Sequence, residues 1–220
     1  MIESLLPCRH KSNLWDDLEL IPFSNNNWNG AIIYLDRDGV INRGSENYIN
    51  SPEELELLPK VAESLSKLRN AGFRLCLVTN QSPINRGLWT HKVLEEIHEK
   101  LIIDLMKIDN NAFLDLILYS PYAPSENSIS RKPSPGMLMA GNVLINSAES
   151  NITLTTPINE LSKSDLFKEH HLSSMVGDRF VDYQAGKSHG VRTYLVNPEI
   201  GLAEVVDRIL DKNDKGDALD

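Results

Sequence analysis

Short apolar runs alternate with amphipathic stretches along most of this 220-residue chain. The runs are four to six residues long, too short for helices, and predict buried strands over 31–35, 73–78, 114–119, 173–176 and 192–196. The stretches between them carry apolar residues at helical spacing and predict helices over 59–70, 90–106, 136–145, 180–189 and 202–210. This alternation is typical of an α/β fold with a doubly wound, Rossmann-like parallel sheet, in which ligands bind beyond the carboxyl ends of the strands.

The same pattern divides the chain into three parts. Residues 1–30 are expected to form an N-terminal extension whose apolar residues pack against the rest, and residues 31–212 to form the domain. Residues 213–220 are expected to be an acidic tail, with the chain frayed from Asp211 onward. A stretch rich in Thr, Asn and Ser over 151–164 reads as an irregular insertion.

Composition narrows the class of protein. The net charge of -9 argues against nucleic acid as a partner, because nucleic-acid binding needs a basic face. No apolar run approaches the roughly 20 residues of a membrane helix, and the N-terminus lacks the pattern of a signal peptide. Two cysteines cannot build a disulfide framework, so a cytoplasmic protein is expected. We also expect a monomer.

The most informative stretch is the first predicted strand together with the turn after it. Asp36 and Asp38 come directly after the strand, and Gly39 then allows a sharp turn. Alternation would send the two carboxylates to opposite faces, so the chain must bend at Arg37 if they converge. Converged carboxylates can provide a nucleophile, a proton donor and a site for a divalent cation. A solvated Asp-rich turn is the alternative for this stretch alone.

Three further strand ends carry polar groups. They are Thr79, the loop with Arg131 and Lys132, and Asp178. In a parallel sheet these ends lie on one rim, so residues far apart in sequence meet there. Phosphoryl transfer requires a nucleophile, a cation against the phosphate oxygens and hydrogen-bond donors, which is the set found here.

Five ordered motifs carry a resemblance. They are Leu35-Asp-Arg-Asp-Gly-Val-Ile-Asn42, Val78-Thr-Asn-Gln-Ser82, Arg86-Gly87-Leu88, Arg131-Lys-Pro-Ser-Pro-Gly-Met137 and Met175-Val-Gly-Asp178. From about Ala31 to Leu210 the chain resembles the haloacid dehalogenase-like (HAD-like) phosphohydrolases. Within them it is similar to the D-glycero-D-manno-heptose 1,7-bisphosphate phosphatases and the histidinol-phosphate phosphatases.

The resemblance implies a role for each matching residue. Asp36 would be the nucleophile, Asp38 the general acid and base, and Thr79 and Lys132 would hold the phosphoryl oxygens. Mg²⁺ would bind to Asp36, the Asp38 carbonyl and Asp178. Asp182 would support the metal site or Lys132. The positions that line the substrate site would be Asn80, Gln81, Ser82, Arg131 and Arg179.

The spacing between the motifs, and two positions at which this chain differs from the family's pattern, refine this expectation. The 43 positions from Asp36 to Thr79 and the 53 from Thr79 to Lys132 leave no room for a cap domain of about 50 residues. Many relatives hold zinc with a Cys-x-His…Cys-x-Cys loop, but here the matching positions are Ser120, Tyr122, Ser128 and Ser130, so no zinc is expected. Pro83 replaces the usual glycine and can reshape the substrate loop.

The sequence therefore predicts a capless, Mg²⁺-dependent phosphatase that acts through an aspartyl-phosphate on a small phosphorylated metabolite. A sugar bisphosphate of the heptose 1,7-bisphosphate type is the expected substrate, and histidinol phosphate is the alternative. A catalytically silent HAD-like binding module is the alternative from another class.

Overall fold

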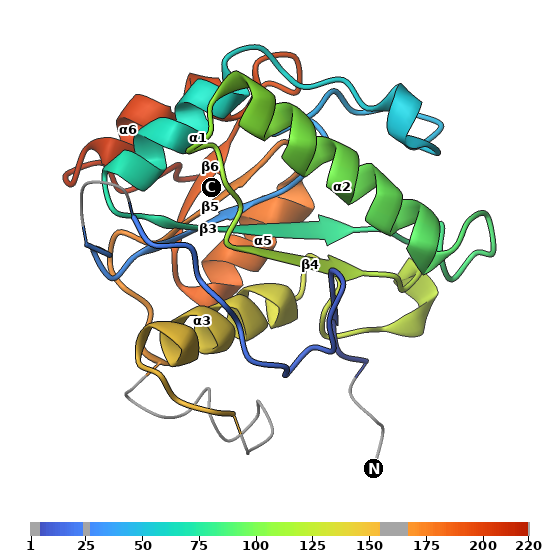
Figure 1. Cartoon of the computed structure of the whole chain (residues 1–220), viewed down its shortest axis with the longest axis horizontal. Helices are drawn as coiled ribbons and strands as arrows, with labels where there is room; N and C mark the ends of the chain where they lie inside the picture. The colour runs from blue at the N-terminus through green and yellow to red at the C-terminus, as the bar shows by residue number, and fades with distance from the viewer. Residues whose placement is uncertain (1–4, 24–26, 155–166, 220) are drawn as a thin grey trace.

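A six-stranded sheet forms the centre of the molecule (Figure 1). The computed structural model describes residues 5–23, 27–154 and 167–219, so the predicted insertion lies largely outside the described residues. The strand order is β1-β4-β3-β2-β5-β6, in which β1 pairs antiparallel with β4 and all other pairs are parallel. The strands are β1 (Cys8–Arg9), β2 (Ile32–Leu35), β3 (Arg74–Asn80), β4 (Leu116–Ser120), β5 (Ser174–Gly177) and β6 (Arg192–Leu195).

Helices cover both faces of this sheet, as the alternating pattern predicts. The α-helices are α1 (Val61–Asn70), α2 (His91–Ile108), α3 (Gly136–Glu149), α5 (Phe180–His189) and α6 (Val206–Leu210). Short 3-10 helices η1 (Pro52–Glu54), η2 (Pro124–Glu126) and η4 (Gly201–Glu204) complete the described elements. The predicted last helix is therefore divided between η4 and α6. The α/β doubly wound fold class is confirmed.

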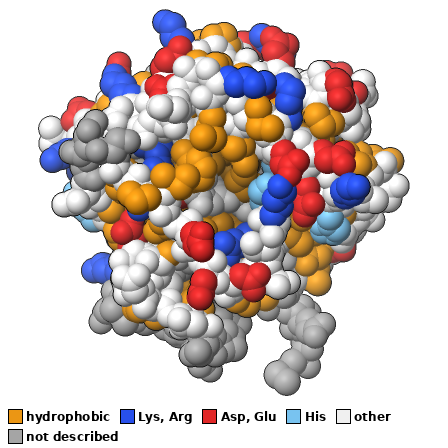
Figure 2. All heavy atoms as spheres, viewed as in Figure 1, with side chains coloured by type: hydrophobic (Ala, Val, Ile, Leu, Met, Phe, Trp, Pro, Cys, Tyr) orange, Lys and Arg blue, Asp and Glu red, His pale blue; other side chains and the backbone are white. Residues whose placement is uncertain are grey.

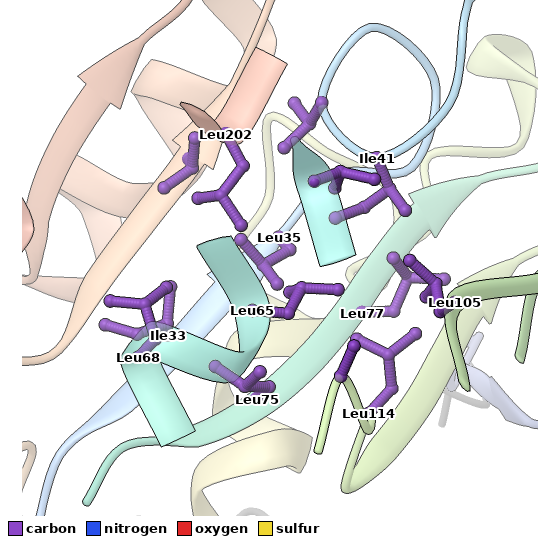
Figure 3. Close-up of a cluster of buried hydrophobic side chains, with 14 of the residues drawn as sticks. Ile33, Leu35, Ile41, Leu65, Leu68, Leu75, Leu77, Leu105, Leu114 and Leu202 are labelled. Carbon is purple, nitrogen blue, oxygen red and sulfur yellow. The ribbon is translucent and has the colours of Figure 1, made fainter. Parts of the chain in front are cut away.

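Two hydrophobic cores form because strand side chains alternate between the faces. On β2, Ile33 and Leu35 join the core beneath α1 and α2, where Leu65, Leu68 and Leu105 are buried (Figure 3). Ile32 and Tyr34 join the opposite core with residues of α3 and α5. Leu14, Trp15 and Leu18 pack against this second core, so this part of the N-terminal extension is anchored as expected.

The expectation of a frayed C-terminus is wrong for the described residues. The Asp217 amide donates to the Thr193 carbonyl at 2.7 Å, and its carboxylate accepts from the Leu195 amide at 2.8 Å. Arg208 forms ion pairs with Asp214 and Asp217. The tail follows β6 and pairs these partly buried polar groups with it, a long-range contact that acidic composition does not reveal.

Charge is distributed without one dominant patch on the face in Figure 2, where acidic and basic side chains are interspersed around an apolar centre. Among the described residues, no helix has the length and apolar character needed to cross a membrane.

Residues 36–60, between β2 and α1, contain only loops and η1, and residues 81–90, between β3 and α2, form a loop.

Candidate active site

The site lies where the strand order reverses. β2 pairs with β3 on one side and β5 on the other, and such switch points open a crevice at the carboxyl ends of the strands. Asp36 follows β2, Thr79 lies near the end of β3 and Asp178 follows β5. The fold therefore brings together groups that the sequence separates by more than a hundred residues.

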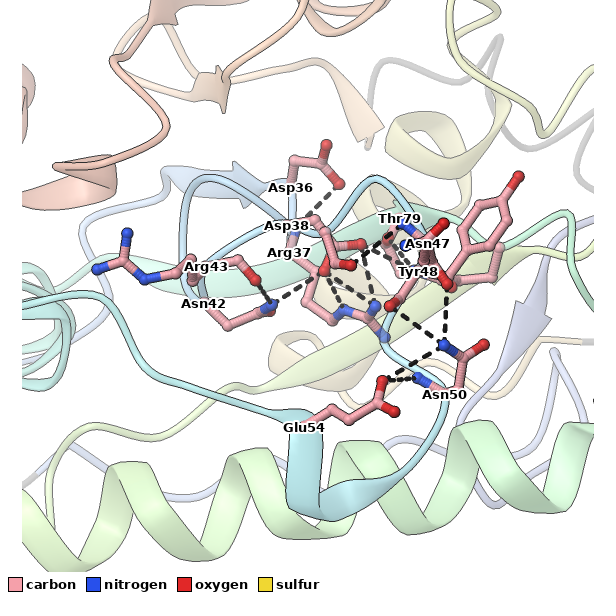
Figure 4. A network of polar contacts seen from close by, with 12 residues as sticks. Asp36, Arg37, Asp38, Asn42, Arg43, Asn47, Tyr48, Asn50, Glu54 and Thr79 are labelled. Atoms are coloured by element: carbon pink, nitrogen blue, oxygen red, sulfur yellow. Dashed lines mark hydrogen bonds and ion pairs between the residues drawn. The ribbon is translucent and has the colours of Figure 1, made fainter.

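The chain bends at Arg37, as the sequence predicts. The Arg37 amide donates to Asp36 Oδ1 at 2.8 Å, and its guanidinium binds both oxygens of Asp38 at 3.0 Å. Figure 4 shows the Asp38 carboxylate directed toward this guanidinium, with Asp36 on the other side of the bend. Gly39 has φ +77°, and a Cβ there would lie 2.7 Å from the Asp178 carboxylate. Only glycine allows this turn so close to Asp178.

Two residues that the sequence reasoning missed hold Asp38. Arg37 is almost completely buried, and Asn42 donates from its side-chain nitrogen to Asp38 Oδ1 at 2.9 Å. Gln81 Nε2 approaches Asp38 Oδ2 at 3.4 Å and donates to Thr79 Oγ1 at 2.9 Å. The position of an arginine between two aspartates is the signal that could have identified Arg37.

Lys132 is buried among carboxylates. Its ammonium lies 2.8 Å from Asp36 Oδ1 and 2.7 Å from Asp182 Oδ1, and it donates to the Val78 carbonyl at 2.8 Å. Burial alone would lower the pKa of Lys132, but Asp182 and Asp36 together raise it, so the ammonium stays charged. Asp182 therefore supports Lys132 directly.

The carboxylates of Asp36, Asp178 and Asp182 lie close enough to share a cation, with one oxygen of each within 4.8 Å of the others. Burial raises the pKa of Asp36 to about 6, against the effect of Lys132. Burial, together with Asp36, also raises the pKa of Asp178 to about 6. Asp178 Oδ1 is buried and has no hydrogen-bond partner among the described residues. Three carboxylates around one ammonium leave an excess of two negative charges, which fits one divalent cation.

The predicted substrate residues lie in different places. Asn80 holds the Lys132 backbone from both sides, since it donates to the Lys132 carbonyl at 3.0 Å and accepts from its amide at 3.1 Å. Gln81 and Ser82 are buried beside β3. Arg131 is half-buried and Arg179 is exposed. Pro83 lies in the loop after β3, where its carbonyl accepts from the Leu88 amide.

Three arginines, Arg86, Arg131 and Arg179, lie beside this site. The sequence predicted a role for Arg131 and Arg179 but none for Arg86. Burial lowers the pKa of Arg131, and the charges of Arg86 and Arg179 lower it further. Arg86 also donates to the Tyr48 hydroxyl at 3.2 Å. Arg86 and Arg179 each repel Arg131, and an anion bound beside Arg131 would offset this repulsion. Arg86 belongs to the motif Arg86-Gly87-Leu88, and this motif could have identified it as a candidate site residue.

Comparisons with known proteins show the family to which the chain belongs. The family model described as polynucleotide kinase 3 phosphatase matches residues 31–158. The D-glycero-D-manno-heptose-1,7-bisphosphate 7-phosphatase of Chlorobaculum tepidum is 30% identical over 172 residues, 75% of this chain and 77% of that protein. The corresponding Pseudomonas aeruginosa enzyme is 38% identical over 108 residues, 49% of this chain and 60% of that protein. Thus the chain matches somewhat more than half of that relative's length.

A solved structure gives the same result. The D,D-heptose 1,7-bisphosphate phosphatase of Bordetella bronchiseptica, crystallised with magnesium and phosphate, has a TM-score of 0.64 and 28% identity. The match covers 83% of this chain and 99% of that one. The chain belongs to the HAD-like phosphatases, and within them to the family that includes these heptose-bisphosphate phosphatases.

Proposed function

We propose that this protein is a Mg²⁺-dependent phosphatase that hydrolyses a sugar bisphosphate of the heptose 1,7-bisphosphate type. The observation that carries the proposal is the convergence of Asp36, Lys132 and Asp178 at the switch point of the sheet. The named activity of the relatives supports the substrate class. The net charge of -9 favours a small substrate over a polynucleotide.

In the proposed reaction, Asp36 attacks the phosphorus. The Arg37 amide and the Lys132 ammonium both contact Asp36 through Oδ1. Oδ2 of Asp36 is therefore left to form the new P–O bond. As the bond to the sugar oxygen breaks, Asp38 gives that oxygen its proton, so the sugar leaves as an alcohol. The product on the enzyme is an aspartyl-phosphate.

The second half of the reaction restores the enzyme. Asp38, now a carboxylate, takes a proton from water, and the resulting hydroxide attacks the phosphorus. The bond between phosphorus and Asp36 breaks, which releases inorganic phosphate and regenerates the Asp36 carboxylate. Arg37 and Asn42 hold Asp38 in place for both proton transfers.

Thr79 and Lys132 would stabilise the phosphoryl oxygens. Thr79 Oγ1 accepts from Gln81, and no acceptor for its own proton is found among the described residues, so that proton is left for the phosphate. Lys132 is held charged at the site by Asp36 and Asp182. Asn80 would act as a positioning residue for the Lys132 backbone, with Gln81 and Ser82 at the wall of the site.

Mg²⁺ fits the donor set, which is made of hard oxygen ligands. Asp36, Asp178 and the Asp38 backbone carbonyl would hold it. When bound, it would neutralise charge on the phosphoryl oxygens. We propose that zinc is absent, because Ser120, Tyr122, Ser128 and Ser130 offer only hydroxyls in the loop that carries zinc ligands in many relatives.

Arg86, Arg131 and Arg179 would bind the second phosphate, which is not cleaved. The short loops after β2 and β3 would leave the site open without a cap domain. We propose a monomer built from an N-terminal extension (1–30), the phosphatase domain (31–212) and a C-terminal segment (213–220). We place it in the cytoplasm, a setting in which two unbridged cysteines, Cys8 and Cys76, are usual.

Phosphate release with Mg²⁺ tests the proposal. The wild-type protein should hydrolyse p-nitrophenyl phosphate, and heptose 1,7-bisphosphate with a much higher kcat/KM. Asp36→Asn should lose turnover of both, because an amide cannot form the aspartyl-phosphate, and its circular dichroism should match the wild type. Arg86→Ala should raise KM for the bisphosphate alone. Turnover by Asp36→Asn at the wild-type rate would exclude Asp36 as the nucleophile, and no turnover of either substrate by the wild type would exclude the proposed activity.

A further inference from the structure

The N-terminal segment crosses the loop that presents Arg131. β1 lies antiparallel to β4, with Cys8 opposite Tyr119, and this pairing places residues 5 and 6 against the loop after β4. The Tyr122 hydroxyl donates to the Leu6 carbonyl at 3.0 Å, and Ser128 Oγ donates to the Leu5 carbonyl at 2.8 Å. We call residues 5–9 the N-terminal clasp.

Three buried serines continue the clasp into the loop. Ser130 Oγ lies 2.7 Å from Ser128 Oγ and 3.4 Å from Ser120 Oγ, so the serines join the start of the loop to its far end. Ser128 gives its one proton to the Leu5 carbonyl and can therefore only accept from Ser130, while the one hydroxyl proton of Ser130 goes to either Ser128 or Ser120. The Ser130 amide also donates to Ser128 Oγ at 3.1 Å. Ser128 is the residue on which these bonds converge.

Arg131 depends on the residues that the clasp holds. Its guanidinium donates to the Tyr122 carbonyl at 2.9 Å, and its amide donates to the Ser128 carbonyl at 3.3 Å. The next residue, Lys132, is held by different groups, namely Asn80, Asp36 and Asp182. Loss of the clasp should therefore displace Arg131 and leave Lys132 in place.

We propose that the N-terminal clasp, through Ser128 and Tyr122, is a positioning element that fixes Arg131 for the second phosphate of the substrate. The loop is held by protein hydroxyls and backbone carbonyls of the extension. This inference rests on the proposed function for the identity of the substrate, whereas the hydrogen bonds of the clasp are independent of it.

Kinetics with two substrates test the positioning role. Ser128→Ala, Tyr122→Phe and a deletion of residues 2–6 should each raise KM for heptose 1,7-bisphosphate by about fivefold, the change expected for one lost hydrogen bond. In these variants kcat for the bisphosphate, and kcat/KM for p-nitrophenyl phosphate, should stay within about twofold of the wild-type values. Ser125→Ala, an exposed serine of the same loop, and a deletion of residues 2–4, which keeps both carbonyls, are the matched controls. An unchanged KM for the bisphosphate in both point variants would overturn the positioning role.

Hydrogen–deuterium exchange separates the clasp from the proposed function. The amides of Ser130 and Arg131 should exchange faster in Ser128→Ala than in the wild type or Ser125→Ala, with Lys132 unchanged. Equal exchange in Ser128→Ala and wild type would overturn the clasp itself. If the wild type does not hydrolyse the bisphosphate, the proposed function fails, and the exchange result alone then supports or overturns the clasp.

Discussion

At the scale of residues, burial and charge balance decide what each carboxylate can do. Asp36 and Asp38 are two positions apart, but Asp36 faces Lys132 and Asp178, whereas Asp38 is held by Arg37 and Asn42. These surroundings fit the proposed roles, since Asp36 lies beside the ammonium and the carboxylates that would hold a cation, whereas Asp38 is held at the bend away from Lys132.

Asp38→Asn should slow turnover by about 10²–10⁴-fold, the usual contribution of general acid–base catalysis. Binding of inorganic phosphate should be preserved, since the amide keeps the bend and its contact with Asn42. Steady-state kinetics together with the inhibition constant of inorganic phosphate measures both effects. A variant within twofold of the wild type would place the proton transfers elsewhere.

Magnesium should stabilise the protein more at pH 7.5 than at pH 5. The pKa of Asp36 and that of Asp178 are raised to about 6 from 3.8 in the metal-free protein. Their contribution to stability is full below pH 3.8 and is lost as the pH rises through 6, where both become charged. A cation offsets this charge, so saturating Mg²⁺ should raise Tm by about 5 °C at pH 7.5 and much less at pH 5.

Thermal unfolding with and without Mg²⁺ measures this shift. Asp178→Asn is the control, and it should respond little at either pH because one ligand and one charge are removed. An equal rise of Tm at both pH values in the wild type would show that these carboxyls do not bind the metal.

At the scale of elements, the loop from β4 to α3 shows how one structural role can be filled by different chemistry. Ser120, Ser128 and Ser130 are buried and hydrogen-bonded, and Tyr122 reaches the N-terminal segment. Hydroxyls without thiolate or imidazole hold Zn²⁺ poorly. Hydrogen bonds, and the fixed φ angles of Pro121 and Pro124, would then lower the cost of ordering this loop.

The purified protein should accordingly carry no stoichiometric zinc by elemental analysis. EDTA should inhibit it, and Mg²⁺ alone should restore activity. A variant with Ser120→Cys, Tyr122→His, Ser128→Cys and Ser130→Cys is the positive control and should bind one zinc ion. One zinc per wild-type chain, or recovery only on addition of zinc, would contradict the expectation.

At the scale of the whole molecule, the sheet separates the site from a buried charge cluster at the opposite ends of the strands. Asp115, just before β4, accepts from Arg69 at 2.7 Å, from Arg74 at 2.7 Å and from the Leu75 amide at 2.8 Å. The two guanidiniums also lie against Phe23, at 5.1 and 4.2 Å from the ring centre. The cluster ties α1, β3, β4 and the N-terminal extension together.

Asp115→Asn should lower the free energy of unfolding by about 3–5 kcal/mol, because it leaves the buried Arg69 without a carboxylate and Arg74 with Glu149 alone. Urea unfolding measures this loss, and kcat of the folded fraction should be unchanged. Asp207→Asn is the matched control: its ion pair with Lys67 is exposed, and its loss should cost less than about 1 kcal/mol. Similar effects of the two variants would show that the buried cluster does not stabilise the fold.

The sequence by itself determined the order of β2 to β6 and of the α-helices, because apolar periodicity is a local property, but it did not predict the two-residue strand β1. It also identified Asp36, Asp178 and Lys132 as candidates, since strand ends of a parallel sheet meet at one rim. Tertiary structure alone decided that Asp182 pairs with Lys132, that Arg37 holds Asp38 and that the acidic tail follows β6. It also decided that residues 5–9 cross the loop before Arg131 and that Asp115 joins two buried arginines. Apart from the contact between the neighbours Arg37 and Asp38, these contacts join segments distant in the chain. All of them depend on how helices and loops pack, which no spacing of residues encodes.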